Sequence, residues 1–324
     1  MAVPSNTVET FDRVGIREDL ADVIYNIAPT ETPFISNAAS GNASQTLHEW
    51  QTDGLANAAA NAQIEGDDYT LGSRAATTRL NNYTQISAKT VGVSGSDQAV
   101  TNAGRGDELA YQLAKLGKEL KRDMEFANIG VENAKAAGAS GTARESASVG
   151  TWYGGNIAGT STSASNFSTN GSPSASPAGT GATAIAGGTN RTFTEALLKA
   201  GLKKCYELGG NPDVVLMSAS HKQLASAFSG VATLYKNADD KTVIGAVDVY
   251  VSDFGEVSFV PDRHQQANRV DILEMDKWEV SYLRPFQTKD LASSGDNDKK
   301  LLLCEWTLTA RSPNANYGIF NLTA

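Results

Sequence analysis

The stretch 107–137 carries the longest uninterrupted helical pattern in the chain, and it constrains the fold more than any other feature. Apolar side chains recur there every three or four residues, which places them along one narrow face of an α-helix. Asp107 stands just before the run, where its carboxylate can cap the first turn. A helix with one apolar face must bury that face, so the chain needs a second layer of structure to receive it. The face consists of Leu109, Leu113, Leu116, Leu120, Met124, Ala127 and Val131.

The opposite side of this helix is charged. Lys115 precedes Glu119 by four residues, and Lys121 precedes Glu125 by the same spacing. Side chains four residues apart are neighbours on a helix surface, so both pairs are predicted to form ion pairs that face water.

The residues that follow, 138–190, offer the helix little to pack on. They are dominated by Gly, Ser, Thr and Ala, a composition that does not form a core of its own. We interpret 138–190 as a surface loop or a long insertion, for which Trp152 and Tyr153 are the anchor.

The composition indicates a folded chain with long irregular segments. Its 324 residues suffice for a substantial core. Hydrophobic residues make up only 40% of the chain, and the number of glycines is high, at 30 residues. A net charge of −9 argues against a protein that grips nucleic acid through a basic surface. The opening MAVPSNTVET lacks the features of a signal peptide, and no run approaches the roughly 18 apolar residues of a membrane span. We therefore expect synthesis in the cytoplasm and no membrane partner.

The segment 15–37, GIREDLADVIYNIAPTETPFISN, predicts a short amphipathic helix followed by an arm. Pro29 ends the helix, and Pro33 keeps the chain extended after it. Few apolar residues follow nearby, so the adjacent sequence provides no partner for the apolar face. That face consists of Ile16, Leu20, Val23, Ile24 and Ile27.

Residues 47–93 predict an extended hairpin. The segments 47–51 and 79–93 have the composition of strands. Between them, 52–73 mixes Ala with Gly, Asn and Asp without a sustained period. A segment of this length without its own core is usually an interaction element.

The chain from 192 onward has the pattern of a compact α+β unit. A helix over 192–208 is followed by a buried strand, a second helix opened by Ser220, and several strands, with a turn near 254–255. A long strand and a short tail, 299–324, complete the chain. The order of elements places this part in the α+β class.

No catalytic motif is present. The three histidines, His48, His221 and His264, lie in no known catalytic or zinc-binding pattern, and the two cysteines are far apart. Cys304 sits in an apolar run, and Cys205 falls on the apolar face of its helix, so we interpret both as core residues. An arrangement of Cys205 with a histidine and an aspartate stays open as an alternative.

The acidic pair Asp67-Asp68 is the remaining candidate for a cation site. It lacks the alternating ligands of a calcium loop, so a solvated turn explains it better. We assign no catalytic residue, no metal and no cofactor to the chain.

The N-terminal motif and the order of segments resemble the major capsid proteins of tailed phages with the HK97-type fold, in particular the SU10-like family. Those proteins carry an acidic helix and then a Pro-Thr-(Glu/Asp)-Thr-Pro-Phe turn near the N-terminus. The matching positions are Arg17, Glu18, Asp19, Leu20, Ile24, Pro29, Thr30, Thr32, Pro33 and Phe34.

The resemblance implies an α+β, HK97-like capsid fold with five parts. These are an N-terminal arm (1–46), an extended loop hairpin (47–93), a peripheral domain with a long spine helix and the Gly/Ser/Thr-rich insertion (94–191), an axial domain (192–285), and a return strand with the C-terminal tail (286–324).

The resemblance also implies a function. Copies of the chain would form hexamers and pentamers of an icosahedral shell, which encloses double-stranded DNA without sequence-specific binding. Decoration or cement, scaffold and portal proteins are possible further partners, and the protein would reside in the virion. The alternatives are another virion or surface-layer subunit, such as a tube, cement or decoration protein, and an enzyme with an unrecognised site.

A shell would explain the apolar face of the arm, because its partners are then other copies of the chain. The residues expected at interfaces between subunits are Ile16, Leu20, Ile24, Ile27, Pro29, Pro33, Phe34, Trp50, Ile64, Tyr69, Leu71, Arg74 and Arg79.

Overall fold

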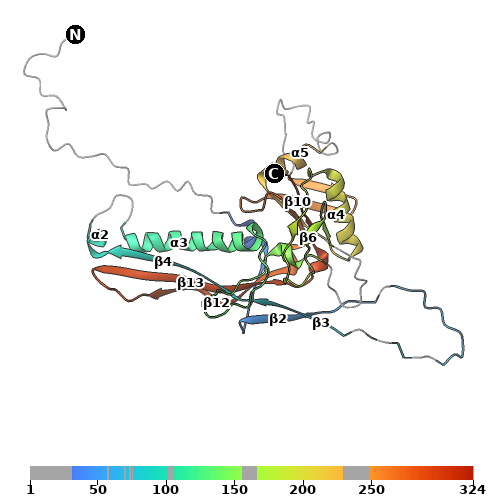
Figure 1. Cartoon of the computed structure of the whole chain (residues 1–324), viewed down its shortest axis with the longest axis horizontal. Helices are drawn as coiled ribbons and strands as arrows, with labels where there is room; N and C mark the ends of the chain where they lie inside the picture. Colours follow the sequence, from blue (N-terminus) through green and yellow to red (C-terminus); the bar gives the residue numbers. More distant parts are fainter. Residues whose placement is uncertain are drawn as a thin grey trace, which may run out of the picture.

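The body of the protein is built on two sheets and has two hydrophobic cores (Figure 1). The larger, main core packs on the four-stranded sheet and also takes in Leu216 and Leu273 of the six-stranded sheet. A long four-stranded sheet with one helix beside it forms one end, and a six-stranded sheet with two helices forms the other. The computed structural model describes residues 31–56, 58–68, 71–72, 74, 76–100, 106–154, 166–228 and 248–323.

The four-stranded sheet has the order β1-β12-β13-β4. The two central strands pair antiparallel from Trp278 opposite Ala310 to Asp290 opposite Lys300. The second half of β13 is buried throughout, because helix and loops cover both of its faces there. Cys304 lies in this half with its thiol buried against the Met124 sulfur, as the apolar run predicts. The strands are β1 (Ala39–Asn42), β4 (Gln85–Ser94), β12 (Trp278–Asp290) and β13 (Asn297–Ala310).

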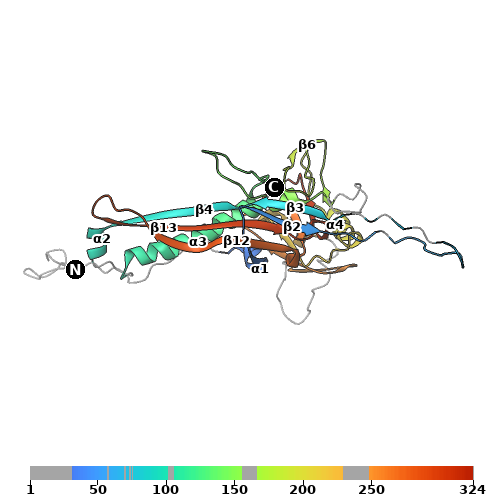
Figure 2. The ribbon, with the colours of Figure 1, turned by 90° about the horizontal axis from the view of Figure 1, so that it is seen from below.

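Helix α3 (Glu108–Glu125) lies along this sheet, beside β4 and β13 (Figure 2). The Asp107 carboxylate accepts from the Ala110 backbone N–H at 3.1 Å, which confirms the predicted cap. Leu120 and Met124 are fully buried in the core between helix and sheet, and Leu113 packs against that core. The predicted apolar face therefore finds its second layer in the four-stranded sheet.

The helix ends earlier than its pattern predicts. After Glu125 the chain forms a π-helical turn, Phe126–Gly130, and then leaves the helix. Lys115 and Glu119 form the expected ion pair at 3.9 Å. The predicted pair of Lys121 with Glu125 is wrong, since Glu125 is buried while Lys121 donates to the Ser36 hydroxyl.

The six-stranded sheet has the order β5-β14-β11-β8-β10-β9. Its core includes Leu198, Leu202 and Cys205 of α4, so the expected core role of Cys205 is confirmed. Gly255 opens β10 with φ of +138°, a value that suits glycine, and this confirms the turn expected at 254–255. The elements are α4 (Glu195–Glu207), α5 (Ala219–Ser226), β5 (Phe167–Ser168), β8 (Val214–Met217), β9 (Val249–Ser252), β10 (Gly255–Pro261), β11 (Val270–Leu273) and β14 (Tyr317–Ile319).

The interpretation of 138–190 as a surface insertion is only partly right. Residues 146–153 are buried, and Ala147 and Val149 join Trp152 and Tyr153 in the main core. The small side chains of Ala147 and Val149 and the large rings of Trp152 and Tyr153 are therefore packed together in one buried segment. The 3₁₀ turn Val149–Trp152 lies in it, and the small hairpin of β6 (Pro173–Ala175) and β7 (Ala186–Gly187) follows.

The two sheets do not follow the boundaries of the five expected parts, because each sheet contains strands from more than one part. Strand β12 begins at Trp278, inside the expected axial domain, yet it belongs to the four-stranded sheet. Strand β14, in the expected return segment, pairs with β11 in the six-stranded sheet. The chain therefore crosses between the sheets after β11 and again after β13.

The remaining elements are short or project from the body. Strands β2 (Leu47–Thr52) and β3 (Thr78–Tyr83) pair antiparallel, which confirms the first part of the predicted hairpin. The rest of the expected returning strand is β4, which pairs with β13 in the four-stranded sheet instead. The other elements are α1 (Pro33–Asn37), α2 (Gly95–Ala99), and 3₁₀ turns at Met275–Lys277 and Pro313–Ala315.

Candidate functional site: assembly surfaces

The extension loop, residues 53–77 between β2 and β3, is the most exposed part of the described chain. It projects away from the body, in the direction opposite to α2 (Figures 1 and 2). Leu55 is 93% exposed, Ile64 75% and Leu71 102%. Between Asp53 and Asp68 the described side chains make only local hydrogen bonds, such as Gln63 to Asn61 at 2.8 Å, and Thr77 at the base of the loop donates to Gln51. Large apolar side chains that are exposed to solvent in this way indicate a binding surface.

The base of the loop is held firmly by one aromatic residue. Trp50 is half-buried, and its indole ring lies 5.4 Å from the ring of Trp152. Its Nε1–H donates to the Ala310 carbonyl at 2.9 Å. Trp50 thus attaches the hairpin to its own subunit, and it offers a neighbouring copy only part of its ring.

Two arginines, Arg74 in the loop and Arg79 in β3 beside it, are positively charged groups that a partner could contact. Arg74 is exposed, and Arg79 is exposed apart from a 3.5 Å ion pair with Glu49 on the facing strand. Such an exposed pair contributes little to stability, about 0–1 kcal/mol, so both guanidinium groups stay available to a partner.

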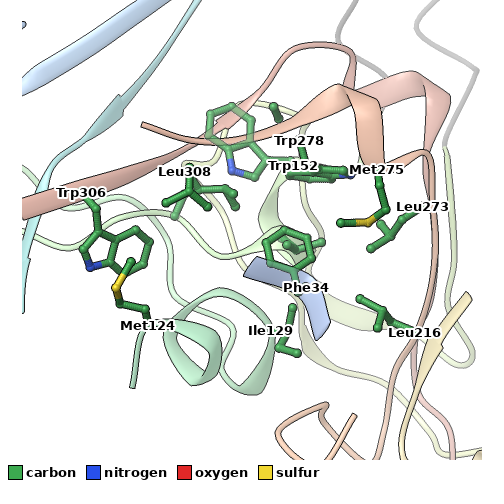
Figure 3. Close-up of a cluster of buried hydrophobic side chains, with 14 of the residues drawn as sticks. Phe34, Met124, Ile129, Trp152, Leu216, Leu273, Met275, Trp278, Trp306 and Leu308 are labelled. Atoms are coloured by element: carbon green, nitrogen blue, oxygen red, sulfur yellow. The ribbon is translucent and has the colours of Figure 1, made fainter. Parts of the chain in front are cut away.

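Phe34 does not lie on a surface, contrary to the expectation that it forms an interface. Its side chain is fully buried in the main core, with its ring edge-on to Trp278 at 6.0 Å (Figure 3). The Pro-Phe motif therefore anchors the arm inside its own subunit, because an aromatic ring gains more from a complete core pocket than from a partly exposed interface. Pro33 begins α1 and is half-buried.

Six of the expected interface residues lie outside the described part of the chain. They are Ile16, Leu20, Ile24, Ile27, Pro29 and Tyr69.

A buried charge network joins the end of α3 to the six-stranded sheet. Arg269 is completely buried and pairs with Glu132 and, at 2.8 Å, with Asp271. A third guanidinium N–H donates to the Ile129 carbonyl of the π-helical turn at 2.8 Å. The Tyr153 hydroxyl donates to the second Asp271 oxygen at 2.7 Å. Arg269 and Asp271 are two residues apart, but the sequence carried no signal for the network, since Glu132, Ile129 and Tyr153 lie more than a hundred residues before them.

A second apolar surface was also missed. Strand β9 is the outer strand of its sheet, with Val249 51% and Val251 70% exposed. Close to it along the chain, the ring of Phe254 lies 5.0 Å from that of Tyr206, and both rings are partly open to solvent. The alternation in VDVYVSDF was the available signal, because it marks a strand with one covered and one open face.

Two of the side chains considered for catalysis, His221 and Cys205, are buried inside the subunit. His221 is buried, with its Nε2 3.1 Å from the Thr323 carbonyl and its Nδ1 2.9 Å from the Ser218 hydroxyl. Burial lowers the pKa of His221, so the neutral ring donates to the carbonyl and accepts from Ser218. Burial also raises the pKa of Cys205 to about 12, which leaves no thiolate for catalysis at neutral pH.

The acidic pair 67–68 lies in an exposed turn, where the Asp68 N–H donates to the Asp67 carboxylate at 2.9 Å. Within the described ranges, no group of three or more His, Cys, Asp or Glu side chains is arranged to hold a metal ion. None of the described helices combines the length and hydrophobicity of a membrane span.

Comparison with known proteins identifies the family. The model of the SU10 major capsid protein family matches residues 3–323. The major capsid protein of Escherichia phage Phieco32 is 27% identical over 354 residues, covering 99% of this chain and 98% of that protein.

Solved structures show the fold. The capsid asymmetric unit of cyanophage A-1(L) superposes with a TM-score of 0.68 at 15% identity, covering 98% of this chain and 99% of the other. The capsid structure of cyanophage P-SCSP1u gives a TM-score of 0.62 at 9% identity over 99% and 100% of the two chains. The chain has the HK97-like capsid fold and, because the family model spans nearly its whole length, it belongs to the SU10 major capsid protein family.

Proposed function

We propose that copies of this chain build the icosahedral shell of a tailed phage by docking the extension loop of each subunit on a neighbouring copy. The supporting observation is the exposure of Leu55, Ile64 and Leu71 on a loop that its own subunit does not cover. Burying each of these side chains would contribute about 1.5–3 kcal/mol. The arm upstream of α1 is proposed to make a second contact of this kind.

A loop variant tests this directly. Replacing Leu55, Ile64 and Leu71 together by serine should leave a folded subunit, because none of them contacts the core, and should abolish assembly. Gln63→Ser, a polar residue of the same loop, is the matched control and should assemble normally. Electron microscopy and size-exclusion chromatography read out the particles. Normal shells from the triple variant would refute the docking role, and wild-type tubes would favour a tube subunit.

Charge on the loop is proposed to select its docking site. Arg74→Glu should weaken assembly, while thermal unfolding of the free subunit stays unchanged, since Arg74 is exposed and forms no ion pair with any of the described residues. Assembly that weakens equally on Arg74→Gln would show that the positive charge, rather than repulsion by the new negative charge, is what matters. Normal assembly of both variants would contradict the proposal.

Hexamers and pentamers of this chain are the proposed building units, with decoration, scaffold and portal proteins as further partners. The protein is proposed to be made in the host cytoplasm and to have no catalytic activity of its own. An activity that Cys205→Ser or His221→Gln removed, with assembly intact, would contradict the last point.

The shell is proposed to enclose double-stranded DNA without binding any particular DNA sequence. The chain has 36 acidic and 27 basic residues, so its overall field does not attract a duplex. Any contact should go to phosphates and weaken steeply as salt rises. Fluorescence-anisotropy titration with two unrelated duplexes is the test, and tight binding that distinguishes between them would overturn this view.

A further inference from the structure

Glu125 occupies an unusual place for an acidic side chain. It is the last residue of α3, directly before the π-helical turn, and it is completely buried. One carboxyl oxygen accepts from the Phe34 backbone N–H at 2.7 Å, and the other accepts from the Ile35 N–H at 2.9 Å. This carboxyl therefore fixes the chain where it enters α1, next to the buried Phe34 ring.

A second acidic side chain meets Glu125 from the six-stranded sheet. Asp262 follows β10, is only 3% exposed, and lies close enough to Glu125 to raise the pKa of the Glu125 carboxyl. Its Oδ1 accepts from the His264 backbone N–H at 2.7 Å, whereas its Oδ2 has no donor among the described residues. Two carboxyl oxygens can share a hydrogen bond only when one of them carries a proton.

The surroundings do not supply a compensating positive charge. Within the described residues, no lysine or arginine forms an ion pair with either carboxyl. Lys121 of α3 turns to the Ser36 hydroxyl, and the exposed Arg263 lies 4.0 Å from Glu31. Asn128 of the π-helical turn donates to the Met124 carbonyl. His264 is the other titratable group beside the pair, and it contributes its backbone N–H to Asp262.

These contacts favour the protonated form of Glu125. Burial and then the hydrogen bond with Asp262 raise the pKa of Glu125 from 4.5 to about 8, although the two amides of α1 act in the opposite direction. Two ionised carboxylates in contact inside a core would repel each other, as in other acid pairs that share one proton.

We propose that Glu125 and Asp262 form a proton-dependent latch that holds the start of α1 against the junction of α3 and the six-stranded sheet. The latch is closed while Glu125 carries a proton and opens when Glu125 ionises beside the buried Asp262. It joins three parts of the subunit at one point: the arm, the helix beside the four-stranded sheet, and the edge of the second core. A change of pH would then act on the attachment of the arm.

The direction of the effect follows from proton linkage. The closed state holds a proton that the open state releases above about pH 4.5, so the stability of the latch is fully present below this value. It decreases as pH rises towards about 8 and levels off above. Between about pH 6 and about pH 8.5 the closing equilibrium should fall roughly 50-fold.

Hydrogen exchange of peptides spanning 31–37, corrected for intrinsic exchange rates, measures this equilibrium in the full-length, unassembled subunit. Wild-type protection should drop on the order of 50-fold between the two pH values. Asp262→Asn keeps an acceptor for the His264 N–H and places an amide donor opposite Glu125, so it should stay closed in both conditions. Asp276→Asn removes the same charge at an exposed position and should behave as wild type.

Protection that is independent of pH in the wild type would overturn the latch. So would a drop in Asp262→Asn as large as that in the wild type. If Asp262→Asn does not fold, the wild type and Asp276→Asn decide the question by themselves, because a latch requires both to lose protection. The test uses free subunits, so its outcome is separate from the proposed docking of the extension loop.

Discussion

The indole N–H of Trp50 donates to the carbonyl oxygen of Ala310 across 2.9 Å, and this bond attaches the extension loop to the end of the longest strand. The loop can therefore project far from the body and still have a fixed base. A rigid base lowers the entropy that docking on a neighbour would cost.

Trp50→Phe should test this attachment, because phenylalanine can still pack near Trp152 but cannot donate to Ala310. The free energy of unfolding should fall by about 1 kcal/mol, the usual contribution of one hydrogen bond. Urea denaturation measures the loss. An unchanged midpoint would mean that ring packing alone holds the loop.

Arg269→Met should be among the most damaging single changes in the protein. It leaves Asp271 and Glu132 without their buried partner, which costs about 3–5 kcal/mol. Arg263→Met, at a side chain that is 66% exposed, is the control and should change stability by less than about 0.5 kcal/mol. Equal midpoints for the two variants in urea denaturation would contradict the structural role of Arg269.

Phe34→Ala distinguishes a core role from an interface role. Removing a fully buried ring should destabilise the free subunit by about 3–5 kcal/mol. Ile64→Ala, on the extension loop, should leave the free subunit within about 0.5 kcal/mol of wild type and affect assembly alone. If the free Phe34→Ala subunit were as stable as the wild type, Phe34 would not be a core residue, and its expected role at an interface between subunits would stand.

Deletion of residues 1–30 should separate folding from assembly. The cut falls before Thr32 and Phe34, so every core residue that the structure describes stays in the chain, and the subunit should still unfold cooperatively in urea. The expected result is a folded subunit that no longer forms shells. Particles of normal size would show that residues 1–30 are dispensable for assembly.

The two thiols should be inert in the native subunit. Burial raises the pKa of both Cys205 and Cys304 to about 12, and both side chains are fully buried. A maleimide added at neutral pH should react only as fast as the protein unfolds, and denaturant should release both thiols. Rapid labelling of the native protein would contradict the burial of at least one of them.

Local patterns were sufficient for most of the elements. The cap at Asp107 and the turn at Gly255 each depend on residues that are close in sequence, so their physical cause is contained in a short segment. The same holds for the motif around Pro29 and Phe34, which was enough to indicate the family. Ile64 and Leu71 of the extension loop were identified because a segment without a core cannot cover them, whereas the equally exposed Leu55 was not identified.

The burial of particular side chains was decided by tertiary structure alone. Glu125 has the spacing of a solvated ion pair with Lys121, yet it is buried because α1 and Asp262 close over the end of α3. Ala147 and Val149 lie in a stretch with the composition of a loop, and they are core residues because two sheets meet around them. A short sequence determines which backbone form is favourable, but whether a side chain meets water depends on partners that lie far away along the chain, as Asp262 does from Glu125.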